Sequence, residues 1–258
     1  MSRTPTRFVN GITNAAKGTN LGMFPLPDPT AVFDSFYDFH QYVAGDWTVT
    51  NTASHATIGL VAGAGGLISI AGGASSVTND IGAIITNPFQ FNLQVNATSS
   101  ALPPTADAWF YTAIKATTAL NDQIQVGITS ANSALAPTDG LYFNKAAGSA
   151  AITFVVRKGS ASLAASAYSS GTTTVATLAD GTFKELGFHY DGKGYINVFV
   201  DEVLVCRVDV GGSTGAVVAT FPQGVSLSSG FGLKAAATAP TTADLVVDFM
   251  LMAQTRPF

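Results

Sequence analysis

The stretch GFHYDGKGYINVFVDEVLVCRVD, residues 187–209, decides the fold class. On either side of its DGKG segment, residues 191–194, apolar side chains alternate with polar or small ones, which is the period of a strand with one buried face. The core face is predicted to carry Leu186, Phe188, Tyr190, Ile196, Val198 and Val200. The stretch therefore predicts a β-hairpin, and Cys206 in the next apolar segment is predicted to be a small buried side chain.

Two chemical interpretations of this stretch fail. GFHYDGKG resembles the phosphate-loop pattern G-x-x-x-x-G-K-[ST], but Gly194 stands where a hydroxyl must bind magnesium, and a strand pattern follows instead of a helix. His189 lies on the face opposite Phe188 and is predicted to be a solvent-facing histidine, because the sequence holds no H-x-x-x-H metal-binding spacing.

Strand alternation continues through the rest of the chain from about residue 46. FQFNLQV, residues 89–95, places its apolar residues on one face, and two short strands are expected around 57–62 and 67–70. In the last strand, Asp244 and Asp248 share a wet face, and the expected core face carries Leu245, Val247, Phe249 and Leu251. Only FDSFYDFHQYV, residues 33–43, suggests a short helix. Segments 96–108, 159–177 and 211–220 are rich in Ala, Ser and Thr and are expected to be exposed loops.

The composition limits the possible partners. Charged residues make up 11% of the 258 residues and the net charge is −4, so a nucleic-acid partner, which needs a basic face, is not expected. The one cysteine excludes an intrachain disulfide, and residues 58–77 are too rich in glycine for a membrane span. A nearly neutral surface of small residues is easily desolvated, which favours contact with other subunits or simply reflects an alanine-rich protein.

No catalytic or metal site is expected. Asp201 and Glu202 are adjacent, which fits a turn better than a pair of catalytic carboxylates, and no calcium-loop pattern occurs. The expectation is therefore a protein that is not an enzyme and that has no cofactor. The aromatic residues leave two alternatives, a sugar-stacking platform or ordinary core packing, and they are Trp47, Trp109, Phe110 and Tyr111.

The chain divides into an arm, residues 1–30, and one β-sandwich domain, residues 31–258. Residues 1–27 carry three basic residues and no acidic one, and the arm ends in FPLPDP, residues 24–29, whose prolines favour an extended chain. Its apolar content is too low for independent folding. We expect the arm to be ordered only where it lies on another surface.

Several phrases resemble tailed-bacteriophage virion proteins in which a concanavalin A-like, laminin G-like jelly roll decorates the head. The phrases are DFHQYVAGDWTV (38–49), DGLYFNK (139–145), LADGTFKELGFHYDGKGYINVFVDEVLV (178–205), FPQGVSLSSGFGLKA (221–235) and LVVDFMLMAQTR (245–256). The resemblance implies an all-β fold, a two-sheet antiparallel jelly-roll β-sandwich preceded by the extended arm. Glu202 stands where the family's usual hairpin phrase has glycine, which leaves the turn type at Asp201–Glu202 open.

The resemblance also implies a structural function. The chain is expected to be a capsid decoration (cement) protein, made in the host cytoplasm, that binds the major capsid protein on the head surface and associates with itself, with a trimer favoured. The residues expected to bind the capsid lie in the arm and are Arg3, Arg7, Phe8, Lys17 and Phe24. The alternative is a lectin-like module of a tail or fibre that binds a glycan. A polysaccharide-degrading enzyme is disfavoured because the clustered glutamates of the fold's glucanases are missing.

Overall fold

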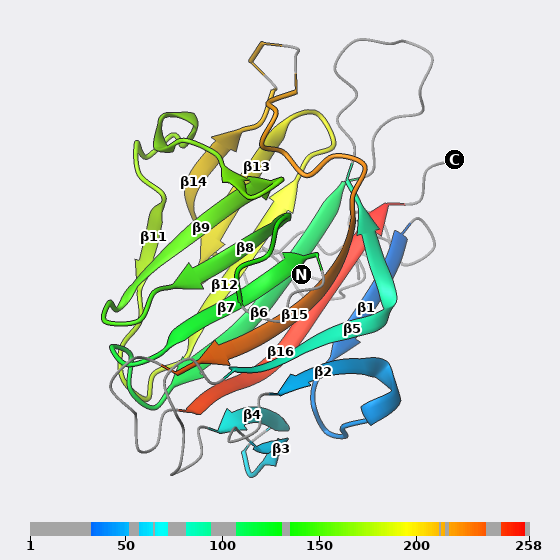
Figure 1. Ribbon diagram of the computed structural model, residues 1–258, viewed down its shortest axis with the longest axis vertical. Helices are drawn as coiled ribbons and strands as arrows, with labels where there is room; N and C mark the ends of the chain where they lie inside the picture. The colour runs from blue at the N-terminus through cyan, green and yellow to red at the C-terminus, as the bar shows by residue number, and fades with distance from the viewer. Residues whose placement is uncertain are drawn as a thin grey trace, which may run out of the picture.

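The computed structural model is a sandwich of two antiparallel sheets, drawn in Figure 1 with the second sheet in front of the first. It describes residues 32–51, 57–63, 65–71, 81–93, 107–130, 135–211, 213–214, 217–235 and 244–255. The predicted all-β jelly-roll fold is confirmed. The arm, residues 1–30, lies outside the described residues.

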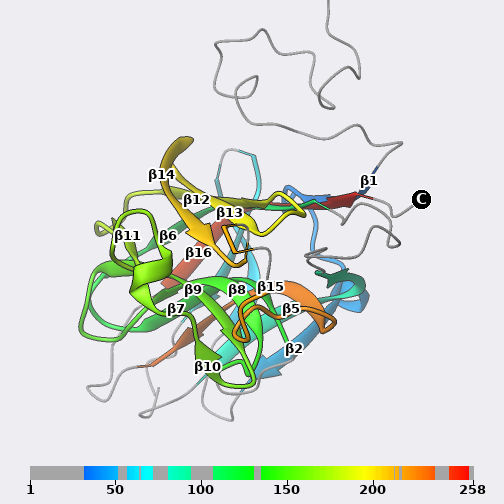
Figure 2. The same cartoon turned by 90° about the horizontal axis from the view of Figure 1, so that it is seen from above.

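The first sheet has eight strands and lies on the upper side of the sandwich in Figure 2, where β12, β13 and β1 are seen. Its spatial order is β14 (Val203–Asp209), β13 (Tyr195–Val200), β12 (Lys184–Tyr190), β6 (Ala108–Ala116), β16 (Asp244–Thr255), β4 (Leu67–Ala71) and β3 (Thr57–Val61). The eighth strand, β1 (Val32–Tyr37), pairs with the C-terminal half of β16. β1 and β14 therefore lie at opposite ends of this layer.

The second sheet also has eight strands. Its order is β10 (Ala161–Ser162), β9 (Ala151–Lys158), β8 (Gly140–Lys145), β7 (Gln123–Thr129), β15 (Ser226–Lys234), β5 (Ile81–Asn92) and β2 (Trp47–Asn51), with β11 (Thr174–Thr177) paired to β9. Two single-turn 3₁₀ helices, η1 (Ala44–Asp46) and η2 (Ala165–Ala167), lie in the connections.

The predicted hairpin is formed by β12 and β13, and its core face is the predicted one. Phe188 pairs with Val198 and both are fully buried between the sheets. The turn is held by Asp191, whose Oδ1 accepts hydrogen bonds from the amides of Lys193 and Tyr195 at 2.8 and 3.0 Å. A turn that leads directly into a strand leaves no helix N-terminus for a phosphate, as the sequence indicated.

The next turn, between β13 and β14, shows the turn type at Asp201–Glu202, which the sequence left open. Both residues have positive φ, 48° and 65°, and Val200 pairs directly with Val203 across them, which is the two-residue type I′ geometry. Asp201 is fixed in place because its carboxylate accepts from Lys184 Nζ at 2.7 Å and from the amide of Glu185 at 3.1 Å. Among the described residues, Glu202 makes no hydrogen bond that offsets the cost of its left-handed backbone.

We therefore expect Glu202→Gly to raise the free energy of unfolding by about 0.5–1 kcal/mol, because glycine adopts positive φ without a Cβ penalty. Chemical denaturation of both proteins measures the change. Asp201→Gly is the matched control. It should bring no gain, since it also removes the bonds to Lys184 and Glu185.

Three expectations for individual segments were wrong. Residues 33–43 contain a strand, β1, where a short helix was predicted. Pairing along all six residues of β1 with β16 outweighs the weak helical spacing. Segment 159–177 is not simply an exposed loop, because it contains β10, η2 and β11, and the buried Tyr168 donates a hydrogen bond to the carbonyl of Phe154 at 3.0 Å.

The third correction concerns β16. Leu245 and Val247 face the core as predicted, but a β-bulge between Val247 and Met250 inserts one extra residue and exchanges the two faces. Met250 and Met252 therefore enter the core, whereas Phe249 and Leu251 pack against Tyr111 on the outer face of the first sheet.

Candidate functional site

The connection between β1 and β2, together with the ends of these strands, forms a pocket. Tyr37, Phe39 and Trp47 lie at its base and pack together, with ring centroids 4.6 Å apart for Tyr37 and Trp47 and 6.1 Å for Phe39 and Trp47. Phe231 of β15 closes the cluster edge-on, 6.0 Å from Phe39. These aromatic residues attach residues 38–46 to the core, so the pocket rests on a rigid base.

The backbone at Phe39 is held in an uncommon conformation with φ of 46°. Gly66 packs directly against it, because a Cβ at residue 66 would lie 2.6 Å from the carbonyl carbon of Phe39 and 2.7 Å from the amide of His40. Only glycine fits there. The β3–β4 connection thus determines the path of residues 38–40.

The pocket has a volume of about 310 Å³ and combines aromatic with polar side chains. Its lining consists of Phe36, Tyr37, Asp38, Phe39, His40, Gln41, Val43, Asp46 and Trp47. His40 Nε2 lies 2.8 Å from Asp38 Oδ2, and both side chains are accessible. An exposed ring beside carboxylate and amide groups can stack on and hydrogen-bond to a small polar ligand.

Further carboxylate side chains lie near this pocket, on the outer face of the first sheet. Burial, with Asp38 and Glu185 nearby, raises the pKa of Asp248 above its usual range. Tyr111 donates a hydrogen bond to Glu185, and burial and this carboxylate raise the pKa of Tyr111. The charges are dispersed, and among the described residues no three of His, Cys, Asp and Glu are placed to hold a metal ion.

His189 differs from its expectation. Its ring stacks on Trp109 with centroids 4.8 Å apart, its Nε2 lies 3.3 Å from Asp107 Oδ2, and its side chain is only 19% exposed. It is on the face opposite Phe188, as predicted, but it is half-buried and partnered where a solvent-facing side chain was expected. This arrangement holds the imidazole in place.

The four aromatic residues considered for a sugar platform do not form one surface. Trp47 and Phe110 belong to the central core, whereas Trp109 and Tyr111 lie on the outer face of the first sheet and are 6% and 8% exposed. The sequence missed Phe36, which is 57% exposed at the pocket, because residues 33–43 suggested a helix.

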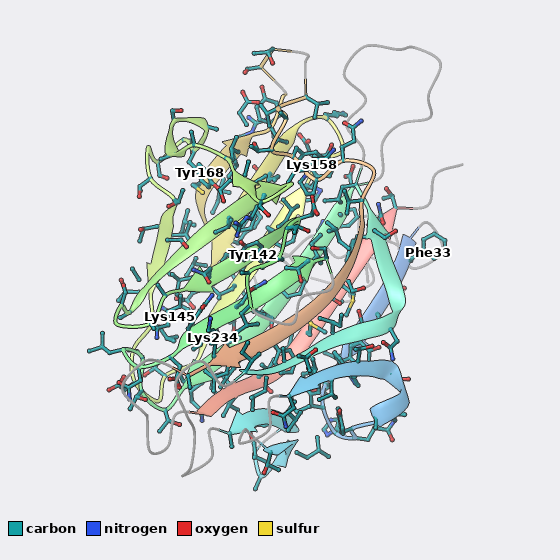
Figure 3. The ribbon with its side chains drawn as sticks, viewed as in Figure 1. Phe33, Tyr142, Lys145, Lys158, Tyr168 and Lys234 are labelled. Atoms are coloured by element: carbon teal, nitrogen blue, oxygen red, sulfur yellow. The ribbon has the colours of Figure 1, made fainter. Side chains whose placement is uncertain are left out.

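Exposed apolar side chains collect at the two ends of the first sheet. Val203, Leu204 and Val205 at the start of β14 are 63%, 53% and 36% exposed, and Phe33 and Phe36 of β1 are 49% and 57% exposed. Figure 3 shows Phe33 at the outer edge of β1. One signal was present in the sequence: three consecutive apolar residues at 203–205 cannot all face the core of an alternating strand.

Lys145, labelled in Figure 3, is a buried cation near one end of β8. Its Nζ donates to the carbonyl of Asp122, and burial lowers its pKa to about 8, although Asp122 acts in the opposite direction. Below this pKa both the folded and the unfolded protein hold the charge. Between this pKa and 10.5, the pKa of the lysine in the unfolded chain, the unfolded chain binds more protons than the folded protein. The free energy of unfolding must therefore rise with pH in this range.

We therefore compare the free energy of unfolding of the natural protein with that of Lys145→Met. The value for the natural protein minus that for the variant is expected to increase by about 2 kcal/mol between about pH 8 and about pH 10. Urea unfolding of both proteins across this range measures the shift. Taking the difference removes the opposing effect of buried tyrosines such as Tyr190, whose pKa burial raises. A flat difference would contradict a lysine that titrates in this window.

Other site expectations stay open. The five arm residues predicted to bind the capsid (Arg3, Arg7, Phe8, Lys17 and Phe24) lie outside the described residues.

Cys206 is buried, as predicted, and burial raises the pKa of its thiol to about 11. No helix in the described part of the chain has the length and apolar character needed to cross a membrane.

Comparison with known proteins identifies the fold. No protein-family model and no curated protein matches the sequence. The structure is similar to a protein of unknown function from Shewanella oneidensis, with a TM-score of 0.54, 15% identity and 87% of each chain covered. It is also similar to arcelin-5, a lectin-like defence protein from Phaseolus vulgaris, with a TM-score of 0.53, 12% identity, and coverage of 88% of this chain and 100% of that one.

The seed lectin of Lotus tetragonolobus gives a similar result, with a TM-score of 0.52, 8% identity, and coverage of 87% of this chain and 99% of the lectin. Sequence identity at this level shows the fold and carries no ligand with it. The chain has the concanavalin A-like, lectin-like jelly-roll fold.

Proposed function

We propose that this chain is a virion structural protein, a decoration (cement) protein that binds the outer surface of a tailed-phage head and stabilises it through contacts between subunits. The observation that carries the proposal is the set of exposed apolar residues at the ends of the first sheet. Such residues, in a chain with only 11% charged residues, suit association better than chemistry. The phrase resemblance to phage virion proteins supports the same function.

The proposed mechanism is mechanical. The basic arm, residues 1–27, lies across neighbouring capsid subunits, with Phe8 and Phe24 as apolar anchors and its basic residues on acidic capsid surface. The sandwich then links neighbouring subunits, which stabilises the assembled head by mass action. No catalytic step or cofactor is part of the proposal.

Co-sedimentation with purified empty heads and with purified tails tests this function. The full chain is expected to sediment with heads. Deletion of residues 1–27 should abolish sedimentation with heads and leave the thermal unfolding of the sandwich unchanged. Binding only to tails would overturn the proposal, and full occupancy of heads by the truncated protein would overturn the role of the arm.

A second candidate function, glycan binding by a tail or fibre module, is supported by the pocket between β1 and β2. Phe36 offers an exposed ring next to Asp38, His40 and Gln41, and these groups can stack on and hydrogen-bond to a sugar. A glycan array with the natural protein and Phe36→Ala tests it. This candidate requires hits that the variant loses by at least about tenfold, and an array without hits removes it.

A further inference from the structure

The connection between β10 and β11 covers the outer edge of β14. Tyr168, labelled in Figure 3, is buried and forms an isolated antiparallel bridge with Val208. The amide of Ser169 donates to the carbonyl of Arg207, and the Oγ of Ser169 accepts from the amide of Arg207, both at 2.8 Å. These contacts fix residues 166–169 against the strand, so a site between them and the sheet is formed before a ligand arrives.

A pocket lies between this connection and the strands β13 and β14. Its polar lining consists of Ser166, Ser169, Tyr195, Arg207 and Asp209, and its volume is about 180 Å³. This volume is below the roughly 300 Å³ at which pockets for drug-sized ligands begin. The pocket therefore suits one small polar ligand.

Arg207 supplies the positive charge of this pocket. Its guanidinium carbon lies 3.6 Å from the centroid of the Tyr195 ring, so the ring supports one face of the group. Stacking on a ring leaves the N–H groups able to donate in the plane of the guanidinium. In the described part of the chain no acceptor bonds to these N–H groups, and the residue is exposed. The ring thus orients the guanidinium while its donors stay available.

The other polar groups limit the kind of anion that fits. A planar guanidinium binds a carboxylate through two parallel hydrogen bonds. The Ser169 hydroxyl accepts from the Arg207 amide and keeps its own O–H for donation. Asp209, whose Oδ1 accepts from the amide of Gly211 at 2.9 Å, adds a negative charge to the lining. This charge disfavours an anion with several charges, such as phosphate, more than a single carboxylate.

We infer that this pocket binds a hydroxylated carboxylate, the chemistry of an acidic sugar residue. The carboxylate lies on the edge of the Arg207 guanidinium, and hydroxyl groups of the ligand bond to Ser166 and Ser169. The inference goes beyond the proposed decoration function and does not depend on it. The site is also separate from the pocket between β1 and β2, whose described lining contains no lysine or arginine.

Titration of the isotopically labelled full chain with sodium glucuronate, followed by NMR, tests the inference. We expect saturable binding with a dissociation constant of about 1 mM, as for one small ligand in an open pocket. Methyl glucoside is the matched neutral probe, because it has a similar ring without the carboxylate. It should bind at least about tenfold more weakly, and so should inorganic phosphate.

Two variants of Arg207 test which group holds the carboxylate. Arg207→Gln removes the charge, whereas Arg207→Lys keeps the charge and loses the planar pair of donors. Both are expected to weaken glucuronate binding at least about tenfold. Lys115→Gln is the matched control, because Lys115 also lies over an aromatic ring, 4.7 Å from the centroid of Phe183, but does not line the pocket. Thermal unfolding shows whether each variant is folded.

Alginate oligomers distinguish the two sources of such a ligand. Tighter binding of the oligomers than of glucuronate assigns the site to an acidic polysaccharide, and weaker binding assigns it to a free sugar acid. Both results keep the inference, since both require a carboxylate on Arg207.

Four results would overturn the inference: no saturable binding of any of these carboxylates, glucuronate binding that Arg207→Gln retains, methyl glucoside that binds as tightly as glucuronate, or phosphate that does so. Binding that Phe36→Ala loses and Arg207→Gln keeps would place the sugar beside Phe36 and support the second candidate function instead. Co-sedimentation with heads tests the decoration function separately, so failure of one proposal leaves the other standing.

Discussion

Gly230→Ala is expected to lower the free energy of unfolding by about 3 kcal/mol, at the upper end of the usual cost of overpacking. Gly230 lies in β15, between Ile85 of β5 and Gly127 of β7. A Cβ there would lie 2.2 Å from the carbonyl oxygen of Ile84 and 2.9 Å from the Cα of Ile85. Both are backbone atoms, so β5 must move before the methyl group fits. Urea denaturation at constant pH measures the loss.

Gly59→Ala is the matched control for this prediction. Gly59 also lies in a strand, β3, but among the described residues other than its two chain neighbours no atom lies within 4 Å of the position its Cβ would take. We expect a change within about 0.5 kcal/mol. A similar small change at Gly230 would show that the sheet bends freely there and would contradict a close approach of backbones as the reason for its glycine.

The local part of the fold could be predicted from the sequence. The hairpin of β12 and β13 is encoded by adjacent residues, since the alternation fixes the face of Phe188 and the Asp191–Gly194 segment fixes the turn. The burial of Cys206 could be predicted from the same alternation of apolar and polar residues. The fold class then rests on many such strands. The resemblance to phage virion proteins added the concanavalin A-like jelly roll, which the comparisons confirm.

The wrong expectations depend on contacts between distant segments. The bulge in β16 exists only against β6, so the sequence of β16 alone placed Phe249 and Leu251 in the core. β1 is a strand because β16 pairs with it, although the two lie more than two hundred residues apart. Strand periodicity carries no information about an extra residue that a partner strand imposes.

The exposed apolar residues and the pocket beside Phe36 could be predicted only in part from the sequence. The run at residues 203–205 signalled exposed apolar side chains, whereas the exposure of Phe36 depends on the pairing of β1 with β16. The pocket beside Phe36 depends on Gly66 packing against Phe39, a contact between two connections. The predicted partner surface in the arm stays a prediction.

The second large effect is expected at the centre of the sandwich, where Phe188→Ala should cost about 3–5 kcal/mol. Phe188 is fully buried and stacks on Phe110 of the first sheet with centroids 5.5 Å apart. It also reaches the second sheet, because its ring lies 5.4 Å from Phe154 and 6.3 Å from Phe143. Removing the ring leaves a cavity that both sheets line. Urea denaturation with a fluorescence readout measures the loss.

Two further variants make this prediction specific to the contact between the sheets. Phe188→Leu keeps most of the volume and should cost less than about 1.5 kcal/mol. Phe183→Ala removes a ring that is 36% exposed and contacts Lys115, so its cost should stay below about 1 kcal/mol. If all three variants lost equal stability, the cost would reflect the loss of any apolar side chain. A loss confined to Phe188→Ala would instead identify this aromatic cluster as the contact that holds the two sheets together, on which any role of the sandwich as a rigid link between capsid subunits depends.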